Sequence, residues 1–165
     1  MQTEIDPRHL TLEQLLETIS SSQPTSGAGV AAAVALALAI GCATKAINVS
    51  LKHGSDAVLD AAALRLRALS ERALAYARTD SALFASYLQT HSQADAAGLV
   101  TSAEEFQELA GEVLSEIEEL RGRVLPTVAI DVSTALRLHS AATSTEVEIL
   151  RSNRKLQARA ESLDT

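Results

Sequence analysis

Apolar positions recur at helical spacing from the beginning of the chain. Between residues 11 and 22, leucines and an isoleucine follow one another at intervals of three or four, which predicts an amphipathic helix. Thr11 with Gln14 three positions later is the pattern of a capping box at the start of that helix. Ser20-Ser21-Ser22 followed by Pro24 predicts its end.

A long uncharged run follows a turn-forming segment. The residues from Gly27 to Ala43 are seventeen in number and include eight alanines and three glycines. This pattern is compatible with three alternatives: a membrane-spanning helix, a phosphate-binding loop and a buried helix. The run only reaches the short limit of about 17–25 residues for a span, and no Trp or Tyr marks an interface. No G-K-[ST] completes a phosphate loop. We therefore expect a buried central helix from about 27 to 49.

The rest of the chain predicts further helices. One begins near residue 55 and continues to about 88, with a possible break at Thr79-Asp80. We expect residues 91–100 to form a loop, after which Ser102 and Glu105 form a capping box at the start of a helix that reaches about residue 125. Pro126 is expected to start the next helix, which ends near residue 140. Thr143 and Glu146 are expected to form the capping box of a last helix. No run alternates at period two. The pattern predicts an all-α fold, a compact antiparallel bundle of about six helices around the alanine-rich one. Residues 1–10 are expected to be an N-terminal arm and 11–165 a single helical domain.

Composition narrows the class of protein. Apolar residues make up 47% of the chain and aromatic residues 2%, so alanine and leucine supply most of the core. The net charge of −7 disfavours a nucleic-acid partner. Residues 45–78 hold six Lys or Arg and residues 104–119 hold seven acids, so we expect these two faces to pair. The N-terminus lacks the pattern of a signal peptide, which favours a cytoplasmic protein.

Four segments together resemble a known family. They are "LEQLLETISSSQPTSGAGVAAAVALALA", "NVSLKH", "LRALSERALAYARTDSALFASYL" and "VLPTVAIDVSTAL". A leucine-rich helix, a P-T-P-G-G-G-S turn, an alanine-rich helix with an N-x-T and lysine exit, and a later helix with Asp and Phe are typical of the cyclodeaminase/cyclohydrolase family. The chain is similar to that family over about residues 11–139.

The resemblance implies a dimeric all-α protein with a tetrahydrofolate site at the glycine turn. The reaction would be hydrolysis of 5,10-methenyl-tetrahydrofolate, or cyclisation of 5-formimino-tetrahydrofolate with loss of ammonia. No cofactor beyond the tetrahydrofolate substrate is implied. The resemblance assigns proton transfer to Asp80 and substrate contacts to Gly27, Ala28, Gly29, Asn48 and Lys52.

The residues themselves leave alternatives open. Asp80 precedes Ser-Ala-Leu, so it could instead be the N-cap of a resumed helix. Lys45 and Lys52 share a helical face and could receive the glutamate tail of a folate or be ordinary surface lysines. We interpret Asp131 and His139, eight residues apart, as structural. No H-x-x-x-H, C-x-x-C or E-x-x-H arrangement occurs, so no metal site is predicted.

Two functions follow from these observations. We favour an enzyme of folate one-carbon metabolism, either the cyclohydrolase or the cyclodeaminase. The alternative is a non-catalytic helical dimer that serves as a folate-binding or protein-interaction module. It rests on Ser26, Ala28 and Val30, which stand where the family has Pro, Gly and Ser. Both alternatives predict a homodimer without a membrane partner.

Overall fold

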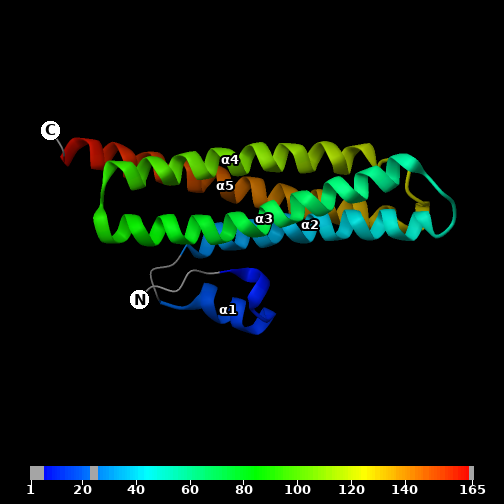
Figure 1. The fold of residues 1–165 in the computed structure, drawn as a ribbon, viewed down its shortest axis with the longest axis horizontal. Coiled ribbons are helices and arrows are strands. Elements are labelled where there is room, and N and C mark those ends of the chain that lie inside the picture. The colour runs from blue at the N-terminus through cyan, green and yellow to red at the C-terminus, as the bar shows by residue number, and fades with distance from the viewer. Residues whose placement is uncertain (1–5, 23–25, 164–165) are drawn as a thin grey trace.

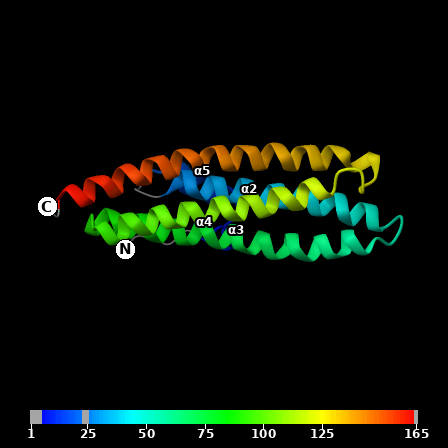
Figure 2. The ribbon, with the colours of Figure 1, turned by 90° about the horizontal axis from the view of Figure 1, so that it is seen from above.

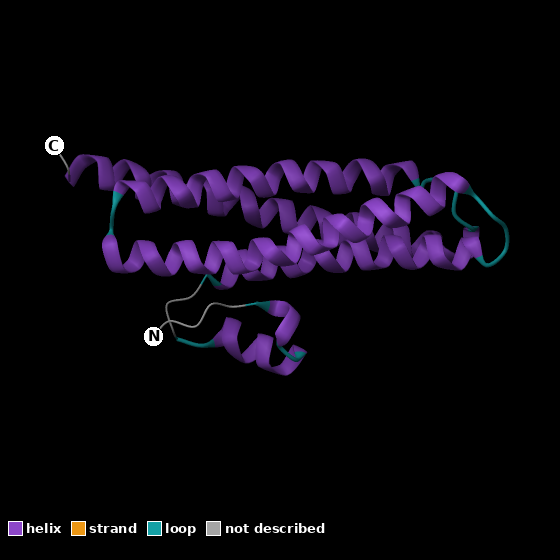
Figure 3. Ribbon diagram, viewed as in Figure 1, coloured by secondary structure: helices purple, strands orange, loops and turns teal. Residues whose placement is uncertain are grey.

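A computed structural model describes residues 6–22 and 26–163 of the chain. In these ranges the protein consists of helices and loops without strands, so the all-α prediction is confirmed (Figure 3). The elements are η1 (Pro7–His9), α1 (Leu12–Ser20), α2 (Gly27–Leu51), α3 (Ala57–Thr90), α4 (Gln93–Glu119), η2 (Pro126–Val128) and α5 (Ala129–Leu163).

The four long helices form an antiparallel bundle. Each of α2, α3 and α4 packs against the next helix in the chain, and α5 returns to pack against α2 (Figures 1 and 2). Helix α3 has 34 residues, which at 1.5 Å per residue makes it roughly 50 Å long. The short helix α1 lies outside the bundle, where it packs against α2.

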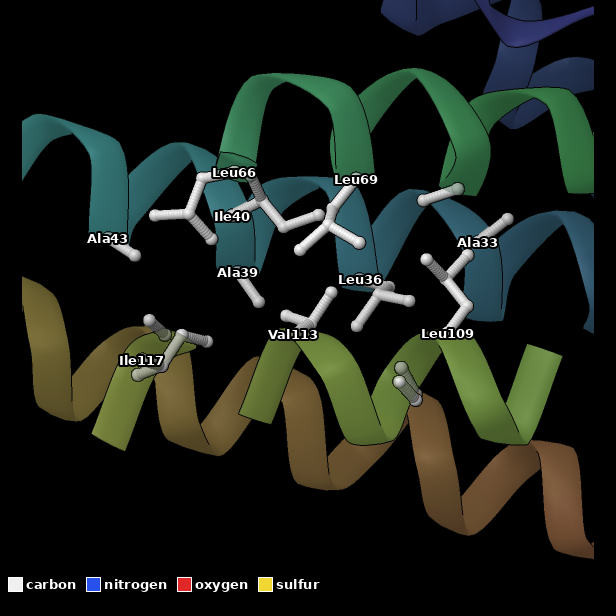
Figure 4. Packing of buried hydrophobic residues seen from close by; sticks show 14 of the residues in the cluster. Ala33, Leu36, Ala39, Ile40, Ala43, Leu66, Leu69, Leu109, Val113 and Ile117 are labelled. Carbon is white, nitrogen blue, oxygen red and sulfur yellow. The ribbon is translucent and has the colours of Figure 1, made fainter. Parts of the chain in front are cut away.

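Small side chains on α2 bring its neighbours close to the bundle axis. Ala33 on α2 lies near Leu109 on α4, and Leu36 on α2 lies near Leu69 on α3 and Val113 on α4, as Figure 4 shows. All five side chains are buried. Because an alanine-sized side chain needs little room, the longer leucines and isoleucines of the other helices can fill the space beside it. The predicted role of the alanine-rich run as the central helix is thus observed.

Helix α2 is long and apolar enough to cross a membrane by length and composition alone, and half of its most apolar stretch is buried inside the bundle. A core helix has this same property. The burial against α3, α4 and α5 accounts for the apolar composition on three sides of α2. One stripe of the helix remains exposed, which we consider below.

Helices α3 and α4 differ from the expected pattern at their junction. Asp56 caps α3 by accepting hydrogen bonds from the backbone N–H groups of Val58 and Leu59, and the helix continues unbroken through residue 80. The prediction of a loop over 91–100 is wrong. His91 adopts a left-handed conformation with φ of 50°, and the Ser92 side chain accepts from the backbone of the next turn. These two residues complete the turn, so α4 begins at Gln93.

Two expected capping boxes are interior to helices. Ser102 is buried in the middle of α4, and Thr143 and Glu146 lie within the unbroken α5. The last two expected helices are therefore one, and the described residues contain five α-helices. The first capping box is confirmed, because the Thr11 hydroxyl accepts from the Gln14 backbone at 3.2 Å and the side chain of Gln14 reciprocates at 2.9 Å.

The expected pairing of the basic and acidic segments is confirmed between α3 and α4. Arg65 donates two hydrogen bonds to Glu116 at 2.5 and 2.9 Å, and Arg72 donates two to Glu112 at 2.6 and 2.9 Å. Both arginines are exposed, so each pair contributes on the order of 0–1 kcal/mol. These ion pairs help to align α3 with α4, whereas burial of apolar side chains in the core provides most of the stability of their association.

Candidate functional site

The glycine turn meets α3 at Asp80. Ser26 precedes α2, and its hydroxyl donates a hydrogen bond to Oδ2 of Asp80. Gly29, in the first turn of α2, faces the same carboxyl group. A Cβ at position 29 would lie 1.9 Å from Asp80 Oδ2 and 2.8 Å from its Cγ. The absence of a side chain at Gly29 is therefore what allows the carboxyl group to reach the beginning of α2.

Asp80 is removed from solvent. Only 1% of the residue is exposed, and this burial raises the pKa of its carboxyl group, because a charge loses its hydration in the protein interior. The hydrogen bond from Ser26 and the nearby hydroxyl of Tyr76 oppose the rise in pKa. The carboxyl group can therefore exchange a proton under conditions in which an exposed aspartate would stay ionised.

A second carboxyl group lies behind Asp80. The hydroxyl of Tyr76, one helical turn before Asp80, donates a 2.8 Å hydrogen bond to Oε1 of Glu146 on α5. Glu146 is fully buried, and its Oε2 has no hydrogen-bond partner. Burial raises the pKa of Glu146 to about 7, with a smaller contribution from the charge of Asp80, while the hydrogen bond from Tyr76 opposes the rise.

These groups form a continuous polar path through the bundle, which we call the buried acid chain: Ser26, Asp80, Tyr76 and Glu146. The ring of Tyr76 packs against Phe106 with centroids 4.5 Å apart, and this contact fixes the direction of the hydroxyl. Burial and the nearby carboxyl groups raise the pKa of Tyr76 far above its usual range. The hydroxyl therefore remains protonated and can both donate and accept.

Sequence reasoning identified Asp80 but missed Tyr76 and Glu146. The alternative that Asp80 is an N-cap is wrong, because α3 is continuous there. Glu146 is assigned by the sequence pattern to a capping box with Thr143. Its position on the buried stripe of α5 could have revealed it, since a charged residue at a core position of a helix is unusual. The buried residues of that stripe, three or four apart, are Val132, Ala135, His139, Ala142, Glu146, Leu150 and Asn153.

The expected substrate contacts divide into two groups. Gly27, Ala28 and Gly29 lie at the N-terminus of α2, next to Asp80, whereas Asn48 and Lys52 are exposed at the opposite end of that helix. The separation along α2 is roughly 30 Å at 1.5 Å per residue. One chain therefore brings the glycine turn to Asp80 but does not bring Asn48 or Lys52 there. Pro24 and Thr25 of the turn lie outside the described residues.

The remaining candidate residues, Lys45, Asp131 and His139, interact with other parts of the bundle and lie away from Asp80. Lys45 pairs with Asp131 at 3.4 Å, and the ring of buried His139 donates from Nε2 to the carbonyl oxygen of Ala110 at 2.8 Å. Among the residues described here, no group of three or more His, Cys, Asp or Glu side chains is placed to hold a metal ion.

Comparison with known proteins identifies the fold and the family. The model of the formiminotransferase-cyclodeaminase family matches residues 11–156. The chain belongs to the formiminotransferase-cyclodeaminase family. The family predicted from the four sequence segments is thereby confirmed, and the matched range contains the whole buried acid chain.

A solved member of similar shape is the formiminotetrahydrofolate cyclodeaminase of Thermotoga maritima. The two chains superimpose with a TM-score of 0.82 at 15% sequence identity, over 95% of this chain and 89% of that one. At this identity the likeness shows the common fold. No curated protein matches the sequence.

Replacing Gly29 by alanine should destabilise the protein by about 1–3 kcal/mol, because the new methyl group would overlap the carboxyl group of Asp80. Urea unfolding followed by circular dichroism measures the change. Gly111→Ala is the matched control: its Cβ would meet nothing within 4 Å, so it should stabilise α4 by about 0.5–1 kcal/mol. Equal stability of the two variants would contradict the close approach of Asp80 to α2.

Proposed function

We propose that this family member is a cytoplasmic enzyme acting on a tetrahydrofolate derivative. The reaction is hydrolysis of 5,10-methenyl-tetrahydrofolate, or cyclisation of 5-formimino-tetrahydrofolate with release of ammonia. The observation that carries the proposal is the carboxyl group of Asp80, buried against the glycine turn with a raised pKa. Family membership over residues 11–156 supports a tetrahydrofolate derivative as the substrate.

Both reactions move a proton at a one-carbon centre, and Asp80 supplies the group for it. In the hydrolysis, the oxygen of water bonds to the methenyl carbon as its proton passes to the Asp80 carboxylate. The bond from that carbon to N5 then breaks as the hydroxyl group on the carbon loses its remaining proton, N5 keeps the electron pair and takes a proton, and 10-formyl-tetrahydrofolate results. In the cyclisation, N10 bonds to the formimino carbon and loses its proton, and the formimino nitrogen gains two protons and leaves as ammonia with the electrons of its bond to that carbon. A general acid or base whose pKa lies closer to neutrality serves either route.

The glycine turn can hold a polar substrate beside Asp80. The first N–H groups of a helix have no partner within that helix and point outward from its N-terminus. The backbone N–H of Val30 bonds to the carbonyl oxygen of Ser26, and the amides of Gly27, Ala28 and Gly29 precede this first bond of the helix. Glycine at two of these positions lets a ligand approach the backbone closely. Asp80 thus lies within reach of a substrate that these amides bind.

The first test is a rate measurement. The purified protein should remove the near-ultraviolet absorbance of methenyl-tetrahydrofolate, or release ammonia from formimino-tetrahydrofolate, faster than buffer does. Asp80→Asn should lower kcat by about 100-fold or more, since general acid–base groups commonly supply about 10²–10⁴-fold.

Asp60→Asn is the control for this test, because it makes the same change at an exposed position of the same helix. It should leave kcat unchanged. Absence of acceleration with either substrate at high protein concentration would overturn the catalytic proposal.

A non-catalytic folate-binding or interaction module is the second candidate. It is supported by the Ser26 hydroxyl, which occupies Oδ2 of Asp80, and by Val30, which is fully buried where the family has serine. Thermal-shift titration with 5-formyl-tetrahydrofolate separates the remaining cases. Ligand at about 100 times its Kd stabilises a protein by roughly 2.7 kcal/mol, whereas an interaction module that does not bind folate would show no shift.

We also propose a homodimer that packs through α2. The exposed stripe of this helix consists of Ala28, Ala31, Leu38, Gly41, Lys45 and Asn48, at intervals of three, four or seven residues. Its small residues suit close helix packing, and 55% of Leu38 is exposed. An antiparallel pair of α2 helices would place Asn48 of one copy near the glycine turn of the other. This arrangement would unite the two groups of expected substrate contacts.

Leu38→Glu should convert the dimer into a monomer, because it places two like charges in an apolar interface. Light scattering coupled to gel filtration measures the mass. Leu64→Glu on α3, where 72% of the leucine is exposed, should leave the mass unchanged. If wild-type protein is monomeric at high concentration, or if both variants behave alike, packing through α2 is excluded.

A further inference from the structure

Glu146 is the least solvated acid of the molecule that the structure describes, and its surroundings contain no opposite charge. From α3 it is approached by Tyr76 and Asp80. On its own helix, His139 lies two turns earlier and is bonded to Ala110. The ionisable residues of α2 are Cys42 and Lys45, and the α4 acids on either side of Phe106 are the exposed Glu104, Glu105 and Glu108.

A buried carboxylate without a cation beside it is costly, and two such groups near each other are more so. Like charges in a medium of low dielectric constant prevent both carboxyl groups from ionising in the same pH range. Asp80 and Glu146 are joined by one hydroxyl group, that of Tyr76, which bonds to Oε1 of Glu146 at 2.8 Å and interacts with Asp80 one turn along α3. The geometry therefore favours a state in which the two acids hold one proton.

We infer that Glu146 is a positioning residue that exchanges a proton with Asp80 through the Tyr76 hydroxyl. This inference rests on the proposed role of Asp80 in proton transfer. Oε1 of Glu146 is the atom that exchanges the proton, because it bonds to the Tyr76 hydroxyl, whereas Oε2 is buried and without a partner. The substrate end of the path is Asp80 at the glycine turn, and Glu146 is its interior end.

The exchange conserves atoms and charge. In one state Glu146 is protonated and donates to the Tyr76 oxygen, and the Tyr76 hydroxyl donates to ionised Asp80. In the exchange, Glu146 passes its proton to the Tyr76 oxygen as Tyr76 passes its own proton to Asp80, which leaves Asp80 protonated and Glu146 ionised. The Tyr76 hydroxyl then donates to Oε1 of Glu146. Asp80 can therefore act as a base in the first state and as an acid in the second, and the two acids share one proton in both. Tyr76 is neutral before and after the exchange.

The protein without substrate provides the first test. Carbon-13 NMR of protein labelled at the aspartate and glutamate carboxyl carbons follows each acid through a pH titration. In wild type, the Asp80 signal should shift twice, once with its own titration and once with that of Glu146. In Glu146→Gln the second shift should vanish, and Asp80 should titrate at lower pH because the neighbouring negative charge is gone.

Glu148→Gln is the matched control, because it removes the same charge from an exposed site two residues along α5. It should leave the Asp80 titration as in wild type. An Asp80 titration that is identical in wild type, Glu146→Gln and Glu148→Gln would overturn the inference.

Kinetics provides the second test and separates this inference from the proposed function. Glu146→Gln and Tyr76→Phe should each change the pH dependence of kcat while KM stays within about twofold, and Glu148→Gln should change neither. Circular dichroism verifies that the variants are folded. An active protein whose pH profile is the same in all four forms would overturn the role of Glu146. If wild type accelerates neither folate reaction, the proposed function fails, and the NMR titration alone decides whether the proton is shared.

Discussion

A helical bundle with an apolar core must keep two carboxyl groups out of water, and this constraint organises the rest of the molecule. Asp80 and Glu146 have almost no exposed surface, so each must hold a proton or be stabilised by hydrogen bonds. Tyr76 provides the bond for Glu146, and Ser26 provides one for Asp80. The elements α2, α3 and α5 must therefore meet at a defined height along the bundle. The packing of these three helices and the protonation of the two acids therefore depend on each other.

Helix α2 solves the geometric part of this problem through its small residues. Gly29 leaves the space that the Asp80 carboxyl group fills, and the alanines that follow let α3 and α4 pack near the axis. By length and apolar composition alone, α2 could be a membrane span. In this bundle, the same small apolar residues allow close helix packing and leave room for the buried carboxyl group of Asp80 at one end of α2. The exposed stripe that remains on α2 carries expected site residues at both of its ends, so the proposed packing of two copies through α2 bears directly on the site.

The sequence predicts the helices well because their apolar spacing is a local property. It predicts Asp80 through the family resemblance. The errors occur where a local pattern competes with burial. Thr143 and Glu146 satisfy the pattern of a capping box, but the buried stripe of α5 keeps the helix continuous and places Glu146 in the core. The position of His91 in a left-handed turn likewise could not be read from residue types. The distance between Asn48 and the glycine turn follows only from the straightness of α2.

The pH dependence of stability tests the buried acid chain most directly. Burial raises the pKa of Glu146 to about 7 in the folded protein from 4.5, so the folded state binds the proton more tightly than the unfolded state does. The stabilisation is complete below about pH 4.5 and is lost as the pH rises to about 7. Glutamine does not titrate, so the unfolding free energy of Glu146→Gln should gain up to roughly 3 kcal/mol relative to wild type across this range. A constant difference between the two proteins at every pH would contradict the account.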